Sequence, residues 1–159
     1  MKRLTGFVCA FLLALFPACA SGTGEAAPSA SSKTSTETTR REIMNIKLKI
    51  GTKTFTATLS DNEATRSLAA LFPLTVDMSE LNGNEYYAYL DTSLPTESKN
   101  PHNIKAGDIK LYGSNCLVIF YKSFSTSYSY TDLGTVDDTA GLLNALKASG
   151  GKVTFSLSE

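Results

Sequence analysis

The sequence predicts a mainly β fold for residues 44–159, in which a closed or nearly closed barrel has two helices covering its ends. Three observations support this prediction. Runs of alternating apolar and polar residues account for about eight short strands, only two segments have the apolar stripe of a helix, and few connections suit a parallel crossover. A barrel is an economical way to bury so many short strands.

The first two strands are predicted to form a hairpin. Large aliphatic side chains alternate with polar ones through residues 45–50, and apolar residues alternate with threonines through residues 54–59. Gly51-Thr52 separates the two runs. A two-residue turn that contains glycine is typical of a tight antiparallel hairpin.

A helix is predicted next. Ser60 and Glu63 fit a capping box, in which the serine side chain accepts a hydrogen bond from the first turn and the glutamate reaches back to the cap. An apolar stripe follows from Ala64 to Phe72. Pro73 is expected to end the helix, because proline has no backbone N–H to donate.

Four further strands are predicted in the middle of the domain by alternation or by apolar runs bounded by turns: residues 74–78, 85–90, 109–112 and 116–121. The last of them is apolar on both faces, which indicates a central strand that is fully covered. Residues 94–107 are predicted to be loop. The Ser/Tyr-rich residues 123–130 fit either a loop or a strand.

A second helix and a final strand complete the domain. Asp137 or Asp138 is expected to cap the helix, whose apolar face comes from leucines within residues 142–146. Gly150-Gly151 should end it. Alternating apolar residues at 153–157 then predict the last strand.

The N-terminus has the order of a secretory signal peptide, assigned here to residues 1–18. Lys2 and Arg3 precede an apolar run within residues 5–16, and small residues follow. The run is shorter than the roughly 20 residues that cross a membrane as a helix.

Cys19 stands where this signal ends, and it resembles the lipobox cysteine of bacterial lipoproteins. Phe16 occupies the position where such signals usually have leucine. The small, polar residues that follow predict a flexible tether, so that residues 19–43 would hold the domain away from a membrane. The prediction is a lipid-anchored protein of the cell envelope, facing outside the cytoplasm. The alternative is ordinary cleavage after Ala18 or Ala20, which would release a secreted protein.

Charge and cysteine content exclude several classes of function. From Met44 onward the chain has ten basic and twelve acidic residues, which argues against a nucleic-acid partner. If Cys19 is acylated, Cys116 has no partner for a disulfide, and we expect it to be a buried, inert thiol. His102 is the only histidine and cannot build a zinc site alone. We predict no cofactor and no metal.

Three stretches of the domain together resemble the bacterial cyclophilin-like domain family. Residues 106–121 read AGDIKLYGSNCLVIFY, residues 81–85 read LNGNE and residues 125–130 read STSYSY. The resemblance extends from about Met44 to Leu157. It implies a cyclophilin-like closed eight-stranded barrel with two helices, in a group whose members are mostly without an assigned activity.

True cyclophilins are prolyl isomerases that rely on an arginine beside an apolar proline pocket, with Phe-His-Arg and Gln-Gly-Gly-Asp segments. Neither segment occurs here, and the single arginine of the domain, Arg66, falls in the first predicted helix. The resemblance therefore transfers no catalytic residue. Isomerase activity is kept as an alternative function, as is an interaction role in an envelope assembly.

The tyrosines are the strongest functional signal, because all seven lie between residues 86 and 130. Tyrosine combines a large contact area with a polar tip, which suits a binding cleft, although it also favours strands. We predict a non-catalytic module that binds a peptide or a small molecule. The candidate contacts are Tyr128, Tyr130, Asn84, Asn115 and Arg66, the last as a ligand anchor at the barrel end.

Overall fold

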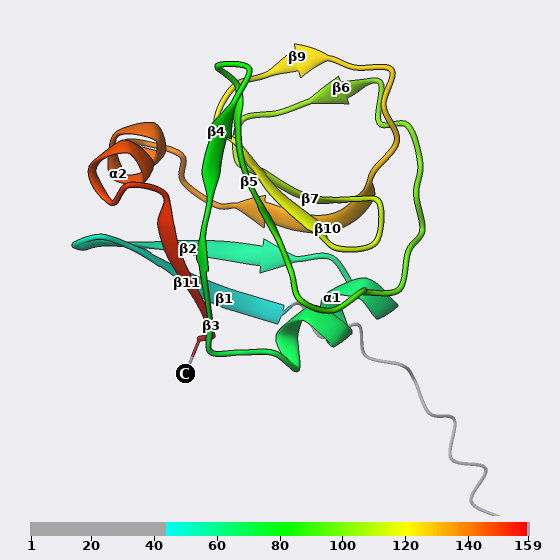
Figure 1. The fold of residues 1–159 in the computed structure, drawn as a ribbon, viewed down its shortest axis with the longest axis horizontal. Helices are drawn as coiled ribbons and strands as arrows, with labels where there is room; N and C mark the ends of the chain where they lie inside the picture. Colours follow the sequence, from blue (N-terminus) through cyan, green and yellow to red (C-terminus); the bar gives the residue numbers. More distant parts are fainter. Residues whose placement is uncertain (1–43, 159) are drawn as a thin grey trace, which may run out of the picture. The chain divides into compact units, whose positions relative to one another are not determined.

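The computed structural model describes residues 44–158, which form an antiparallel sheet curled into a nearly closed barrel, with two helices packed on it (Figure 1). The predicted signal peptide, Cys19 and the tether lie outside the described residues. In chain order the elements are β1 (Met44–Ile50), β2 (Lys53–Leu59), α1 (Glu63–Ala69), β3 (Leu74–Asp77), β4 (Ser79–Leu81), β5 (Glu85–Tyr89), β6 (Asn103–Ile104), β7 (Asp108–Tyr112), β8 (Cys116–Phe120), β9 (Phe124–Ser125), β10 (Thr131–Val136), α2 (Leu142–Ala148) and β11 (Lys152–Leu157).

The barrel closes through one bent segment. The nine-stranded sheet has the order β3-β11-β1-β2-β10-β7-β8-β5-β4, so its two edge strands are consecutive pieces of the chain interrupted only at Met78. The first piece pairs with β11 and the second with β5. Counted as one strand, they reduce the nine to eight. The predicted eight-stranded, mainly β barrel is therefore confirmed.

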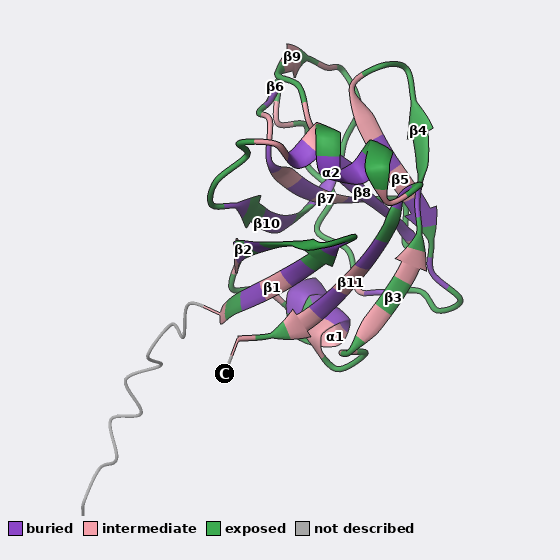
Figure 2. Cartoon of the chain, turned by 90° about the vertical axis from the view of Figure 1, so that its left-hand side faces the viewer, coloured by how far each residue is buried: buried purple, intermediate pink, exposed green. Residues whose placement is uncertain are grey.

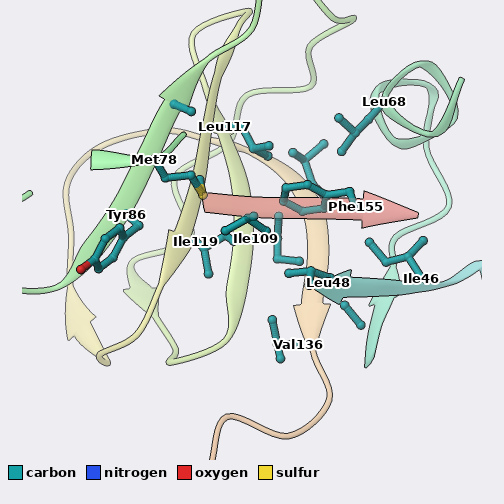
Figure 3. Packing of buried hydrophobic residues seen from close by; sticks show 14 of the residues in the cluster. Ile46, Leu48, Leu68, Met78, Tyr86, Ile109, Leu117, Ile119, Val136 and Phe155 are labelled. Atoms are coloured by element: carbon teal, nitrogen blue, oxygen red, sulfur yellow. The ribbon is translucent and has the colours of Figure 1, made fainter. Parts of the chain in front are cut away.

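The barrel core follows from the alternation in the sequence. The predicted hairpin of β1 and β2 is present, and its register puts Ile46 opposite Ala57 and Leu48 opposite Phe55. Ile46, Leu48 and Ile50 are at most 1% exposed, while their neighbours reach the surface, as the striping of β1 in Figure 2 shows. Burying each such side chain contributes roughly 1.5–3 kcal/mol. Figure 3 shows Ile46 and Leu48 beside Phe155 of the neighbouring strand β11, and Ile109 of β7 belongs to the same cluster.

Both helices bury leucines in this core, Leu68 from α1 and Leu146 from α2. The capping box predicted for the first helix is wrong in its residues. Asn62 is the cap, because its side chain accepts from the Thr65 amide at 2.9 Å and the Thr65 hydroxyl accepts from the Asn62 amide. The Ser60 hydroxyl instead donates to the Asp132 carboxylate, which lies on β10.

The cap predicted for the second helix is also wrong. The helix begins after Gly141, which has a left-handed backbone and makes no side-chain cap bond. Asp137 accepts a 2.8 Å hydrogen bond from the Thr58 hydroxyl, and Asp138 accepts one of 2.8 Å from the Ala140 amide. Both aspartates thus hold the turn that leads into α2.

A second, smaller core lies on the outer face of the barrel wall. Every residue of β8 is buried, which confirms the prediction of a strand covered on both faces. Leu117 and Ile119 face the barrel core, whereas the alternate residues join a separate cluster with Ile104 and Tyr130: Cys116, Val118 and Phe120. The ribbon of β6 and β9 supplies Ile104 and Phe124 to that cluster. Residues 94–107, predicted to be loop, thus include a short strand.

Candidate functional site

The candidate site begins with the alternation of β5. Tyr86 and Ala88 belong to the barrel core, so Glu85, Tyr87 and Tyr89 lie on the outer face. Their partners across the strand pair are Phe120, Val118 and Cys116 of β8. The outer face of this pair therefore presents one carboxylate and two tyrosines over a floor of apolar residues.

A cleft of about 490 Å³ lies between this outer face and the segment 124–130. Its volume is within the ~300–1,000 Å³ typical of sites for small ligands. It is lined by Leu81, Asn82, Asn84, Glu85, Tyr87, Tyr89, Tyr112, Cys116, Val118, Phe124, Ser125, Thr126, Ser127, Tyr128 and Tyr130. Five of the seven tyrosines in the chain are among these residues.

The five tyrosines form two groups. On β5, Tyr87 and Tyr89 meet edge to face, with ring centres 5.8 Å apart. In the second group, the ring centre of Tyr112 on β7 lies 6.1 Å from that of Tyr128 and 5.7 Å from that of Tyr130. The interplanar angles are 89° and 54°. The rings thus present faces and edges in several directions, as aromatic pairs prefer.

The segment that closes the cleft is held by hydrogen bonds. The Thr126 amide donates to the His102 carbonyl at 2.9 Å, and the Tyr128 amide donates to the Thr126 hydroxyl at 3.1 Å. Tyr130 and Lys99 exchange backbone hydrogen bonds of 2.9 and 3.0 Å. The wall that contains Tyr128 is therefore held in place by hydrogen bonds within the protein itself.

Three of the five predicted contacts come together here. Tyr128, Tyr130 and Asn84 all line the cleft, Tyr128 with 61% of its surface exposed and Tyr130 with 8%. Asn115 does not line it, because its side-chain amide donates to the Leu90 carbonyl at 3.1 Å. Arg66 is also elsewhere, on α1, where it pairs with Asp61 at 2.6 Å.

Asn84 offers an unused polar atom at the cleft. Its side-chain oxygen is buried and has no hydrogen-bond partner among the described residues. Its backbone carbonyl, in contrast, accepts from the Tyr121 amide at 3.0 Å. Leaving a buried polar atom unpaired costs about 1–3 kcal/mol. Because this oxygen is buried, a ligand could bond to it only after the Asn84 side chain turned toward the cleft.

Glu85 is the site residue that sequence reasoning missed. It is the one acidic or basic side chain lining the cleft within residues 44–158, and no hydrogen bond or ion pair engages its carboxylate there. Burial, and secondarily Glu80, raises the pKa of this carboxyl. The signal was available: a period of two puts residue 85 on the same face as Tyr87 and Tyr89.

The neighbouring Glu80 differs, because one oxygen of its carboxylate, Oε1, accepts two hydrogen bonds. It accepts a 2.8 Å hydrogen bond from the Tyr121 hydroxyl and one of 2.6 Å from the Gly83 amide. Burial and this bond to Glu80 raise the pKa of Tyr121 to about 12. Glu80 is therefore part of the turn structure, whereas Glu85 is free to meet a ligand.

Reactive chemistry finds little support at the cleft. Burial, and secondarily Glu85, raises the pKa of the Cys116 thiol, which disfavours the nucleophilic thiolate. The predicted inert, buried character of Cys116 is consistent with this. Within residues 44–158, no cluster of His, Cys, Asp or Glu is suited to hold a metal ion.

Comparison with known proteins assigns this barrel to a family. A sequence model of the cyclophilin-like family matches residues 48–158, which is most of the chain. The chain belongs to the cyclophilin-like family. The resemblance read from the sequence is thereby confirmed. No curated protein matches this cyclophilin-like chain. None of the helices in the described part of the chain has the length and apolar character needed to span a membrane.

Proposed function

We propose that this cyclophilin-like domain is a non-catalytic module that binds a peptide or small organic molecule, held at the outer side of a membrane by a lipid on Cys19. The observation that supports binding is the cleft itself: five tyrosines, an unengaged carboxylate and the side chain of Asn84 line one cavity of about 490 Å³. Convergence of a few polar groups in an aromatic cleft is the usual form of a ligand site.

Prolyl isomerisation has less support. The chemistry needs an arginine that hydrogen-bonds the substrate, and none lines the cleft in the described part of the chain. Arg66, the single arginine of the domain, is bound to Asp61 on α1. A proline-isomerisation assay with a proven isomerase as control separates the two functions, because the binding module should show no rate above background.

Tyrosine resonances provide a direct test of binding. In the full-length chain, labelled on the tyrosine rings with ¹³C, five rings line the cleft, while Tyr86 and Tyr121 serve as internal references. A set of short peptides and small organic molecules is titrated in turn. At least one compound should shift the cleft resonances and leave the references in place. If no compound does so, the proposed function is wrong.

A pair of variants ties such binding to the cleft. Tyr128→Ala removes a ring that is largely exposed, so it should weaken binding by about tenfold without unfolding the domain. Leu157→Ala is the matched control, because Leu157 is 54% exposed on β11 and does not line the cleft. Equal loss in both variants would contradict a site at the tyrosines.

A further inference from the structure

The charge of the cleft restricts its ligand. Glu85 contributes the one carboxylate to the lining of the cleft, and within residues 44–158 no lysine, arginine or histidine lines it. An anionic ligand would therefore meet an uncompensated carboxylate. A cationic ligand would supply the counter-charge that the carboxylate lacks, and pairing a part-buried charge stabilises it.

The aromatic rings favour the same sign of charge. A tyrosine ring has a negative face, and cations bind over such faces within about 6 Å of the ring centre. Tyr87 and Tyr89 stand at 82° to each other, and Tyr112 and Tyr128 at 89°. Rings set at such angles can surround a compact cation rather than stack on a flat ligand.

Glu85 lies within electrostatic reach of both sides of the cleft. After burial, its charge is the largest cause that raises the pKa of Tyr130, on the far wall from β5. The charge of Glu85 also raises the pKa of Cys116, on the floor of the cleft, where it again comes second to burial. A cation seated between the two walls would therefore lie close to the carboxylate as well as to the rings.

The rim fits a chain that continues beyond the cation. Ser127 and Asn82 supply a hydroxyl and an amide group along the opening. The other two polar side chains there are already engaged, because the Ser125 hydroxyl donates to the Asn103 side chain at 3.0 Å and the Thr126 hydroxyl accepts from the Tyr128 amide. Backbone amides of a peptide would meet the first two groups as donors and acceptors. A free small amine would leave them unused.

We infer that the cleft binds the ammonium group of a lysine side chain in a peptide, with Glu85 as its counter-ion and the tyrosine rings as its walls. This inference rests on the proposed function, since it names the ligand chemistry of the same cleft.

The test compares charged and neutral probes of the same shape. The full-length chain, ¹³C-labelled on its tyrosines and kept in a neutral maltoside detergent, is titrated with acetyl-Gly-Lys-Gly-amide, with its norleucine counterpart and with n-butylammonium. The lysine peptide should bind at least about tenfold more tightly than the norleucine peptide, as expected for a charge-assisted contact. It should also bind more tightly than the free amine, and added salt should weaken it.

Two charge-neutralising variants complete the test. Glu85→Gln should cost the lysine peptide about tenfold in affinity and leave the norleucine peptide unchanged. Glu63→Gln is the matched control, because Glu63 is an exposed carboxylate on α1 that does not line the cleft. Far-ultraviolet circular dichroism reports whether each variant is folded. If Glu85→Gln is unfolded, the salt dependence of wild-type binding decides.

Several outcomes overturn the inference. Equal affinity for the lysine and norleucine peptides, or unchanged affinity for the lysine peptide in Glu85→Gln, would show that the ligand's charge does not contribute to binding. The cleft would still bind peptides in that case, and the proposed function would stand. Equal affinity for butylammonium shows that the peptide is not the source of the cation. Failure of every probe and of the wider compound set would overturn the inference and the proposed function together.

Discussion

The backbone amide of Met78 donates a 2.9 Å hydrogen bond to the carbonyl of Gly151 at the point where β3 passes into β4. Because β3 and β4 are the two edges of the sheet, this contact lies at the closure of the barrel. Gly151 has a positive φ of 85°, and a Cβ built there would stand 1.9 Å from the Met78 carbonyl oxygen. The close approach of the two backbones thus requires glycine.

Gly151→Ala is predicted to destabilise the domain by about 3 kcal/mol or more, because neither backbone can move without opening the barrel. The adjacent Gly150→Ala is a matched control. Gly150 also has a positive φ, of 64°, but a Cβ there meets nothing within 4 Å, so only the left-handed strain of about 1–2 kcal/mol applies. Urea unfolding of both variants provides the comparison, and similar midpoints would contradict the role given to the Met78 contact.

Tyr86 and Tyr89 are predicted to respond to substitution in opposite ways, because they lie on opposite faces of β5. Tyr86 is 6% exposed in the barrel core, so Tyr86→Ala should cost about 3–5 kcal/mol of unfolding free energy. Tyr89 is 68% exposed, so Tyr89→Ala should change stability by about 0.5 kcal/mol or less while weakening ligand binding. Thermal unfolding and the tyrosine titration measure the two effects; a large loss of stability in Tyr89→Ala would contradict this assignment of faces.

Alternation alone placed these two faces correctly, and it explains most of what the sequence could predict. A period of two identified the hairpin of β1 and β2, the doubly covered β8 and the core residues on each strand. Barrel closure was harder, because Asp77-Met78-Ser79 has no glycine or proline to mark the bend. The bend depends on Gly151, which is distant in sequence and looks there like an ordinary helix terminator.

The helix caps and the site residues were less predictable, because each depends on contacts made elsewhere. Ser60 fits a local capping box, yet Asp132 of β10 takes its hydroxyl, and Asn62 becomes the cap. Asn115 looked like a ligand contact but donates to the Leu90 carbonyl, which directly follows β5. Glu85 looked like the polar start of a strand, and only folding places it among the tyrosines.

The unengaged carboxylate of Glu85 should make the stability of the domain depend on pH. Burial, then Glu80, raises its pKa in the folded state above the ordinary value of 4.5. The folded chain therefore holds this proton more tightly than the unfolded chain does. The contribution of Glu85 is most favourable below about pH 4.5 and is lost as the pH rises through the raised folded pKa.

Glu85→Gln is accordingly predicted to unfold at a higher temperature than wild type at pH 7 and at a similar temperature at pH 4. The exposed Glu63→Gln should track wild type at both values. Calorimetric scans at the two pH values give the comparison. Should Glu85→Gln be less stable than wild type at pH 7, the carboxylate would have a stabilising partner, and its availability for a cation would be in doubt.

Membrane attachment is predicted to depend on Cys19. The order of charged, apolar and small residues before it, and the tether after it, support acylation at this position. Each buried methylene of an acyl chain contributes about 0.8 kcal/mol, so several chains on one cysteine hold a protein firmly. Cys19→Ser should therefore move the protein from the membrane fraction to the soluble fraction, or leave it unprocessed, with the barrel still folded. Fractionation and incorporation of labelled palmitate measure this.

Cys9→Ser is the control for this substitution. Cys9 lies within the apolar run of the predicted signal and would be removed with it, so its loss should change neither palmitate labelling nor fractionation. If the wild-type chain takes up no label and is already soluble, then Phe16 and Pro17 prevent recognition of the site as a lipobox. The protein would in that case be cut after Ala18 or Ala20 and released, because an unacylated Cys19 supplies no apolar chain to hold it.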